Sequence, residues 1–146
     1  MESKTILIAY TDDPWARSVS TFLQGLGYRI EMVGVLSEVI RSVRNGNVYV
    51  ILLDDEVEGM KAYDVVPLLK KINLKIQIIA VSSEESLEGV RRLREGGIFY
   101  QSMKPIDLEE IKSAVECALE KIRRESLIEG LFAFLMPGNV PALGTI

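Results

Sequence analysis

Short apolar runs alternate with segments of helical periodicity along most of this chain, and this alternation limits the folds open to it. Five runs have the length of a β-strand: Thr5–Tyr10, Tyr28–Val33, Val48–Leu53, Ile76–Val81 and Ile98–Met103. The first, third and fourth are apolar almost throughout, which is typical of strands buried on both faces of a parallel sheet. The other two are more polar and suit outer positions. The pattern predicts a five-stranded parallel sheet covered by helices.

The segments between these runs carry apolar residues at helical spacing. The sequence predicts five helices: one from Trp15 to Leu26, ended by Gly27; one around Val39–Val43; one over Val65–Ile72 with Pro67 in its first turn; one over Leu87–Leu93; and one from a capping-box-like Asp107–Glu110 through Ile122. Five successive βα units with right-handed crossovers form a three-layer α/β domain.

Composition excludes several classes of function. The 146 residues carry a formal net charge of −4, whereas nucleic-acid binders need a basic surface, so we expect no nucleic-acid partner. The chain has no histidine, which removes Ser-His-Asp triads and histidine-ligated zinc, and its one cysteine, Cys117, cannot form an internal disulfide. No signal peptide and no membrane-spanning stretch are visible, so a cytoplasmic protein is expected.

Polar side chains follow four of the predicted strands. The first strand is followed by Thr11-Asp12-Asp13-Pro14, the third by Asp54-Asp55-Glu56, the fourth by Ser82-Ser83-Glu84 and the fifth by Lys104-Pro105. Ligands of open α/β sheets bind beyond the carboxyl ends of the strands, so we expect these groups to meet at one edge of the sheet.

Converging carboxylates repel one another unless a cation lies between them, and oxygen ligands alone favour Mg²⁺. A nearby lysine supplies a positive charge for an anion. Such a site could handle phosphoryl groups, with a carboxylate as nucleophile. Each part also has an ordinary structural explanation: Asp12 and Asp13 as a helix cap, Asp54–Glu56 as a solvated turn, and Ser82 and Ser83 as the start of the fourth helix.

The segments ILIAYTDDPWAR, VILLDDEVEGM, IIAVSS and GIFYQSMKPID, in this order, resemble the receiver domain of two-component response regulators over about residues 4–124. The resemblance implies a flavodoxin-like (βα)5 fold with strand order 2-1-3-4-5. It also implies Asp54 as phosphoacceptor, Ser82 and Lys104 as phosphoryl-binding residues, and a cis bond before Pro105. The implied Mg²⁺ ligands are Asp12, Asp54, the Glu56 backbone carbonyl and, if the register slips by one residue, Asp13.

The same resemblance implies that the chain is not an enzyme but a phosphoacceptor that assists its own phosphorylation. The implied donor is a histidine kinase or phosphotransfer protein, and the signal passes to a downstream protein target. Three departures from the family pattern bear on this function. Thr11 replaces the first acid of the usual pair, Gln101 replaces the aromatic switch residue, and Glu58 and Ala62 replace Pro and Gly in the loop after Asp54.

Two hypotheses therefore stand beside each other: a phosphorylated receiver, and a pseudo-receiver that acts as a constitutive protein-interaction module. Residues 1–124 form the predicted receiver domain, and residues 125–146 form an apolar extension of the last helix with a tail. This extension either folds back on its own domain or packs on another surface, and a homodimer through the last helices is one possibility. The 146 residues leave no room for an output domain, so we expect either a stand-alone receiver or a piece of a larger protein.

Overall fold

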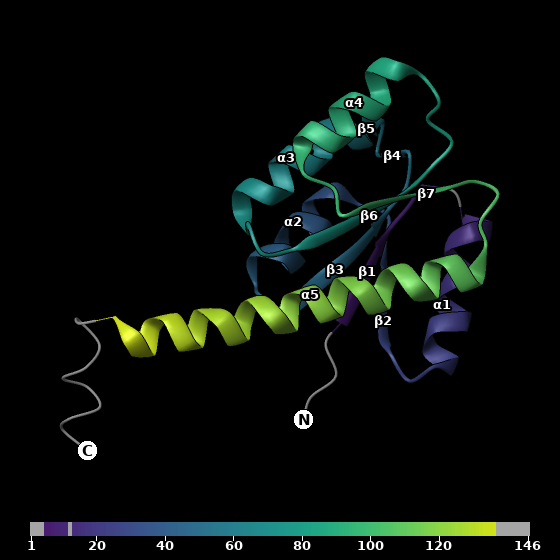
Figure 1. Cartoon of the computed structure of the whole chain (residues 1–146). Helices are drawn as coiled ribbons and strands as arrows, with labels where there is room; N and C mark the ends of the chain where they lie inside the picture. Colours follow the sequence, from purple (N-terminus) through teal and green to yellow (C-terminus); the bar gives the residue numbers. More distant parts are fainter. Residues whose placement is uncertain (1–4, 12, 137–146) are drawn as a thin grey trace.

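The computed structural model describes residues 5–11 and 13–136. Five parallel strands form the main sheet: β1 (Thr5–Ala9), β2 (Arg29–Val33), β3 (Val48–Leu53), β6 (Gln77–Ser82) and β7 (Tyr100–Met103). Their order is β2-β1-β3-β6-β7 (Figure 1). This is the predicted order 2-1-3-4-5, because β6 and β7 are the fourth and fifth strands of the main sheet. The flavodoxin-like α/β fold is confirmed.

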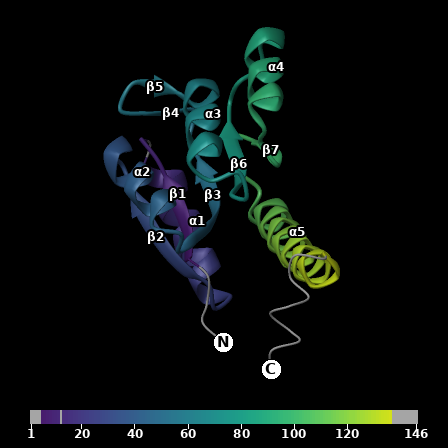
Figure 2. The ribbon, with the colours of Figure 1, turned by 90° about the vertical axis from the view of Figure 1, so that its left-hand side faces the viewer.

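Helices cover both faces of the sheet, which makes three layers (Figure 2). The helices are α1 (Asp13–Gly25), α2 (Leu36–Arg44), α3 (Ala62–Ile72), α4 (Leu87–Gly96) and α5 (Leu108–Leu135). One buried cluster joins α1 and α5 to one face of the sheet, and a second joins α2, α3 and α4 to the other. The side chains of β1, β3 and β6 alternate between these two clusters, so these strands are apolar on both faces apart from polar residues at their ends.

The helix starts differ from the sequence predictions at two places. Pro67 was predicted in a first turn, but α3 begins at Ala62 and Pro67 lies in its interior. The prediction was wrong because the apolar spacing begins later than the helix itself. Asp107 is the N-cap of α5, as predicted, and accepts hydrogen bonds from the amides of Glu109 and Glu110. The Glu110 side chain bonds to Tyr100 and Ser102 on β7, so it does not complete a capping box.

A small antiparallel hairpin, β4 (Glu56–Val57) and β5 (Met60–Lys61), follows β3 and was not predicted. Its two-residue turn places Glu58 at φ 51° and Gly59 at φ 80°. Two positive φ values are the requirement of a type I′ turn, and proline cannot adopt one. The absence of the family's proline at position 58 is therefore a condition for this hairpin.

The last helix continues as one element through residue 135 and projects past the sheet (Figure 1). Six large apolar side chains near its end are more than half exposed: Leu127, Ile128, Leu131, Phe132, Phe134 and Leu135. The described part of the extension thus does not fold back on its own domain, contrary to one of the two alternatives. Among residues 5–11 and 13–136, no helix is long and apolar enough to cross a membrane.

Candidate functional site

Asp54 stands directly after β3, the middle strand of the sheet, and is 2% exposed. Its amide donates to the Ala9 carbonyl at 2.9 Å, which continues the pairing of β3 with β1. Both carboxylate oxygens accept hydrogen bonds from the backbone. Oδ1 accepts from the amide of Asp55 at 2.7 Å, and Oδ2 accepts from the amide of Thr11 at 2.8 Å. The sheet and its loops therefore fix this carboxylate at the carboxyl edge of the strands.

Lys104 follows β7 and reaches across the edge of the sheet to Asp54. Its Nζ lies 2.7 Å from Asp54 Oδ1 and 3.2 Å from Asp55 Oδ2. The peptide bond between Lys104 and Pro105 is cis, as the resemblance implied. Lys104 also lies over the ring of Trp15, with Nζ 5.8 Å from the ring centroid. The only tryptophan of the chain is therefore placed to report on this site.

Ser82 and Ser83 point to Asp55 rather than capping a helix. Ser82 Oγ donates to Asp55 Oδ1 at 2.9 Å, while the amide and hydroxyl of Ser83 donate to the same carboxylate at 3.0 and 2.8 Å. The N-cap of α4 is Ser86, whose hydroxyl accepts from the Gly89 amide. The helix-start explanation of Ser82 and Ser83 is thus wrong, and both residues belong to the site.

The contacts between Asp55 and Lys104 favour the charged form of both side chains. Burial opposes ionisation of Asp55, but hydrogen bonds from Ser83, Ser82 and Lys104 outweigh it and hold the pKa of this carboxyl below its ordinary value. Burial likewise opposes the charged form of Lys104, yet the hydrogen bonds and negative charges of Asp54 and Asp55 raise the pKa of the ammonium. Lys104 is therefore held in its ammonium form and Asp55 in its carboxylate form at neutral pH.

Of the predicted Mg²⁺ ligands, Asp54 and the Glu56 carbonyl lie together at this edge. Thr11 joins them, because its hydroxyl donates to the Glu56 carbonyl oxygen at 2.8 Å and its amide donates to Asp54 Oδ2. Asp12 and the side chain of Asp13 lie outside the described residues. Within residues 5–11 and 13–136, no three acidic or cysteine side chains gather closely enough to hold a metal.

Gln101, the predicted switch position, lies on β7 beside the loop before α4. Its Nε2 donates to the Glu84 carbonyl at 3.3 Å. The neighbouring Tyr100 points to the opposite face and donates to Glu110 on α5, as strand alternation predicted. The residue at the switch position is therefore tied to the segment that carries Ser82 and Ser83, through an amide rather than an aromatic ring.

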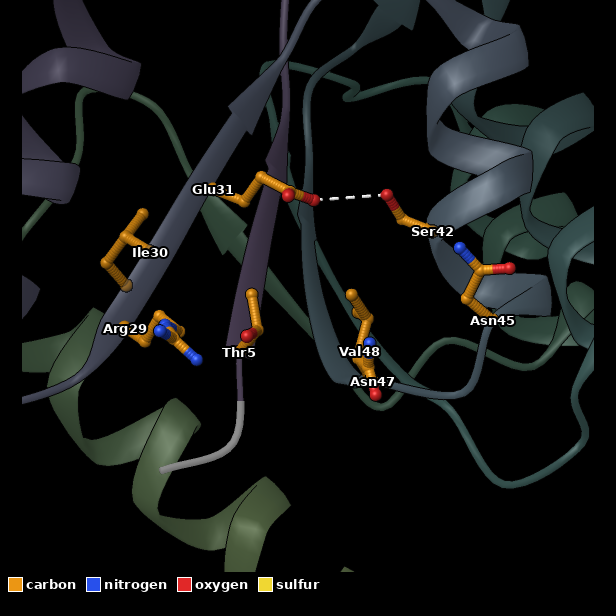
Figure 3. Close-up of a pocket in the computed structure, with 8 residues that line it drawn as sticks. All are labelled: Thr5, Arg29, Ile30, Glu31, Ser42, Asn45, Asn47 and Val48. Carbon is orange, nitrogen blue, oxygen red and sulfur yellow. Dashed lines mark hydrogen bonds between the residues drawn. The ribbon is translucent and has the colours of Figure 1, made fainter. Parts of the chain in front are cut away.

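A separate pocket of about 350 Å³ lies at the amino ends of β1, β2 and β3 (Figure 3). Its lining includes a hydrogen bond between Ser42 and Glu31, 3.0 Å long. The amino ends of parallel strands lie at the edge of the sheet opposite Asp54. The pocket is therefore distinct from the site and brings together none of the predicted functional residues.

The role of Asp55 is not predicted from the sequence, in which it is one acid of a run. In the structure it is the partner of Ser82, Ser83 and Lys104. The available signal was its place directly after Asp54, where the end of the strand lets successive side chains both reach the carboxyl edge. Thr11 is a departure from the family's acid in the sequence, and nothing in the sequence predicts its hydrogen bonds to Asp54 and Glu56.

Comparisons with known proteins indicate one family. A family model described as the response regulator receiver domain matches residues 6–116. The chain is 35% identical to the DNA-binding transcriptional regulator NtrC of Azospirillum brasilense over 120 residues, which are 82% of this chain and 25% of that protein. It is 29% identical over 66 residues to sporulation initiation phosphotransferase F of Bacillus subtilis, covering 45% of this chain and 53% of that protein.

Solved structures show the same fold. A CheY-like receiver domain protein from Methanospirillum hungatei superposes with a TM-score of 0.79 at 22% identity, over 85% of this chain and 99% of that one. The beryllofluoride-activated NtrC4 receiver domain dimer superposes with a TM-score of 0.73 at 18% identity, over 81% of this chain and 98% of that one. The chain spans about a quarter of the length of the NtrC proteins that it matches.

Proposed function

The chain belongs to the response regulator receiver domain family of two-component systems, and from this premise we propose that Asp54 accepts a phosphoryl group. The observation that carries the proposal is the pair of Asp54 and Lys104. A carboxylate that is 2% exposed at the end of the central strand lies 2.7 Å from an ammonium. Lys104 neutralises the carboxylate in the resting chain and would provide a positive charge for the oxygens of a phosphoryl group attached to it.

The donor in this proposal is a histidine kinase or a phosphotransfer protein. An Asp54 carboxylate oxygen attacks phosphorus, and the bond between phosphorus and the donor's imidazole nitrogen breaks. The nitrogen keeps the electron pair, and the product is an acyl phosphate on Asp54. Lys104 and the Ser82 hydroxyl bind the oxygens of the transferred group. The chain thus assists its own phosphorylation without being an enzyme.

Mg²⁺ is the proposed cofactor, and the donor chemistry of the site fits it. Asp54 Oδ2 and the Glu56 carbonyl are hard oxygen ligands, and both are held by Thr11 at the same edge. Asp12 would supply a further carboxylate. When bound, the ion offsets the negative charge that gathers on the phosphoryl oxygens. Because Thr11 stands where the family pattern has a second acid, we expect weak affinity.

The output of the proposed function is a protein contact, and we propose a cytoplasmic setting for it. The exposed apolar end of α5 is a surface for such a contact. Its six large side chains are all more than half exposed, and exposed apolar area of this extent marks interaction sites.

A second copy of the chain is the partner we propose for this surface, through pairing of the last helices. Leu131→Glu would lower the sedimentation coefficient of the full chain to that of a monomer, whereas Ser113→Glu on the domain part of α5 would not. Equal behaviour of both variants would exclude the pairing.

A pseudo-receiver remains the second candidate because of one observation. Thr11 and Asp55 already satisfy the groups that metal and phosphoryl would need: the Glu56 carbonyl, Ser82 and Lys104. A chain in which these hydrogen bonds never break would not be phosphorylated and would act as a constitutive protein-interaction module.

Beryllofluoride distinguishes the two candidates. Added with Mg²⁺, it forms a phosphoryl-like group on a reactive aspartate, and Trp15 lies under Lys104 as a reporter. We expect a saturable change in tryptophan fluorescence in the wild-type chain and none in Asp54→Asn. The absence of any change in the wild-type chain, at concentrations that saturate an active receiver, would favour the pseudo-receiver.

A further inference from the structure

Four hydrogen-bond donors converge on the carboxylate of Asp55. They are Ser82 Oγ at 2.9 Å, Ser83 N at 3.0 Å, Ser83 Oγ at 2.8 Å and Lys104 Nζ at 3.2 Å. Two hydroxyls, one amide and one ammonium around an anion form an oxyanion-binding cradle. The cradle is built by the carboxyl ends of β6 and β7, and its occupant comes from the end of β3.

This cradle shares its ammonium with Asp54. Lys104 contacts both carboxylates at once, at 2.7 Å for Asp54 and 3.2 Å for Asp55. Because one ammonium contacts both oxygens, Asp54 Oδ1 and Asp55 Oδ2 lie close together. A phosphoryl group attached to Asp54 and the carboxylate of Asp55 would draw on the same ammonium and the same Ser82 hydroxyl, and their like charges would repel.

The backbone holds Asp55 in this position from both sides. Its amide donates to Asp54 Oδ1 at 2.7 Å, and its carbonyl accepts from the Ala62 amide at 2.8 Å, where the β4–β5 hairpin leads into α3. With the backbone held, rotation of the side chain is the smallest movement that would empty the cradle. The side chain is 32% exposed and therefore borders solvent.

We propose that Asp55 is a tethered anion that occupies the phosphoryl cradle of this receiver and competes with any oxyanion for Ser82, Ser83 and Lys104. The proposal deepens the proposed function, because it names what must leave before a phosphoryl group on Asp54 can be held. It also means that the Ser82–Ser83 segment is drawn toward the site in the unphosphorylated chain.

Binding of inorganic phosphate tests the proposal without any covalent step. The comparison uses full-length chains that carry Asp54→Asn, so that the acceptor carboxylate neither reacts nor repels the probe. Phosphate is titrated against Asp54→Asn alone and against Asp54→Asn with Asp55→Ala, and Trp15 fluorescence is followed. We expect at least about tenfold tighter binding when Asp55 is removed, since like-charge juxtaposition in a binding site costs more than one decade of affinity. Asp54→Asn with Glu38→Ala is the matched control, because it removes an exposed acid on α2 and leaves the cradle intact.

Two outcomes would overturn the proposal: equal phosphate affinity with and without Asp55, or the same gain in the Glu38→Ala control. Addition of Ser83→Ala to the tighter-binding variant should reduce the gain, because it removes one donor of the cradle. Near-ultraviolet circular dichroism confirms that each variant is folded. Failure of the proposed function has a different signature, since Asp54 would then stay unphosphorylated while removal of Asp55 still opens the cradle to phosphate.

Discussion

Replacement of Lys104 by alanine is the perturbation whose cost follows most directly from the structure. The change removes the ammonium that lies 2.7 Å from Asp54 and 3.2 Å from Asp55, and leaves both carboxyl groups without it. Loss of one partner of a fully buried ion pair costs about 3–5 kcal/mol. The Lys104 side chain is 22% exposed and that of Asp54 is 3% exposed, so solvent reduces the cost, and we expect about 2–3 kcal/mol.

Urea unfolding, followed by both tryptophan fluorescence and circular dichroism, measures this loss. For a domain of this size the midpoint should fall by about 1–2 M. Lys75→Ala is the matched control, because it breaks an ion pair of the same 2.7 Å length whose two side chains are 65% and 55% exposed. Its midpoint should hardly move. Asp54→Asn added to Lys104→Ala should restore part of the stability, since it removes the unpaired buried charge. If Lys104→Ala and Lys75→Ala shift the midpoint equally, the reasoning from burial is wrong.

Three further predictions follow from individual contacts. Thr11→Asp should tighten Mg²⁺ binding by roughly tenfold in a calorimetric titration, because it adds a carboxylate beside Asp54 and the Glu56 carbonyl; unchanged affinity would exclude residue 11 from the metal site. The pKa of Asp55 is lowered in the folded chain, so its contribution to stability is present above the ordinary aspartate pKa of about 4 and is lost as the pH falls through the folded value. Asp55→Asn should therefore flatten the acid limb of stability against pH, and an unchanged limb would contradict this. Glu58→Pro should destabilise the chain by about 2 kcal/mol or more in thermal unfolding, because proline cannot adopt φ 51° and the bond from the Leu36 amide to Glu58 Oε1 is lost; Glu58→Gly, which keeps the turn and loses only that bond, should cost less.

The sequence predicts the fold well because each strand carries its own signal. Val48–Leu53 is apolar without interruption, and the structure buries it between two helical layers. Placement of Asp54 and Lys104 at one edge follows from the parallel order of the strands alone. The hairpin after Asp54 has no such signal, because its strands are two residues long and its turn depends on the backbone conformation of Glu58.

The hydrogen bonds within the site are harder to predict than the residues that form it. Asp54 and Asp55 are identical residues side by side, and only three-dimensional contacts show that Lys104 serves both while Ser82 and Ser83 bind the second. The same holds for the apolar end of α5. Its sequence indicates that it needs a partner, and the structure shows that its own domain does not supply one.

Mass spectrometry of the chain after incubation with Mg²⁺ and acetyl phosphate tests the central claim most directly, because it detects the acyl phosphate itself. We predict one phosphoryl group on the wild-type chain, located on the peptide that contains Asp54, and none on Asp54→Asn. Faster labelling of Asp55→Ala than of the wild-type chain is expected if the tethered anion limits access. No adduct on either the wild-type chain or Asp55→Ala would contradict the claim that this receiver is a phosphoacceptor.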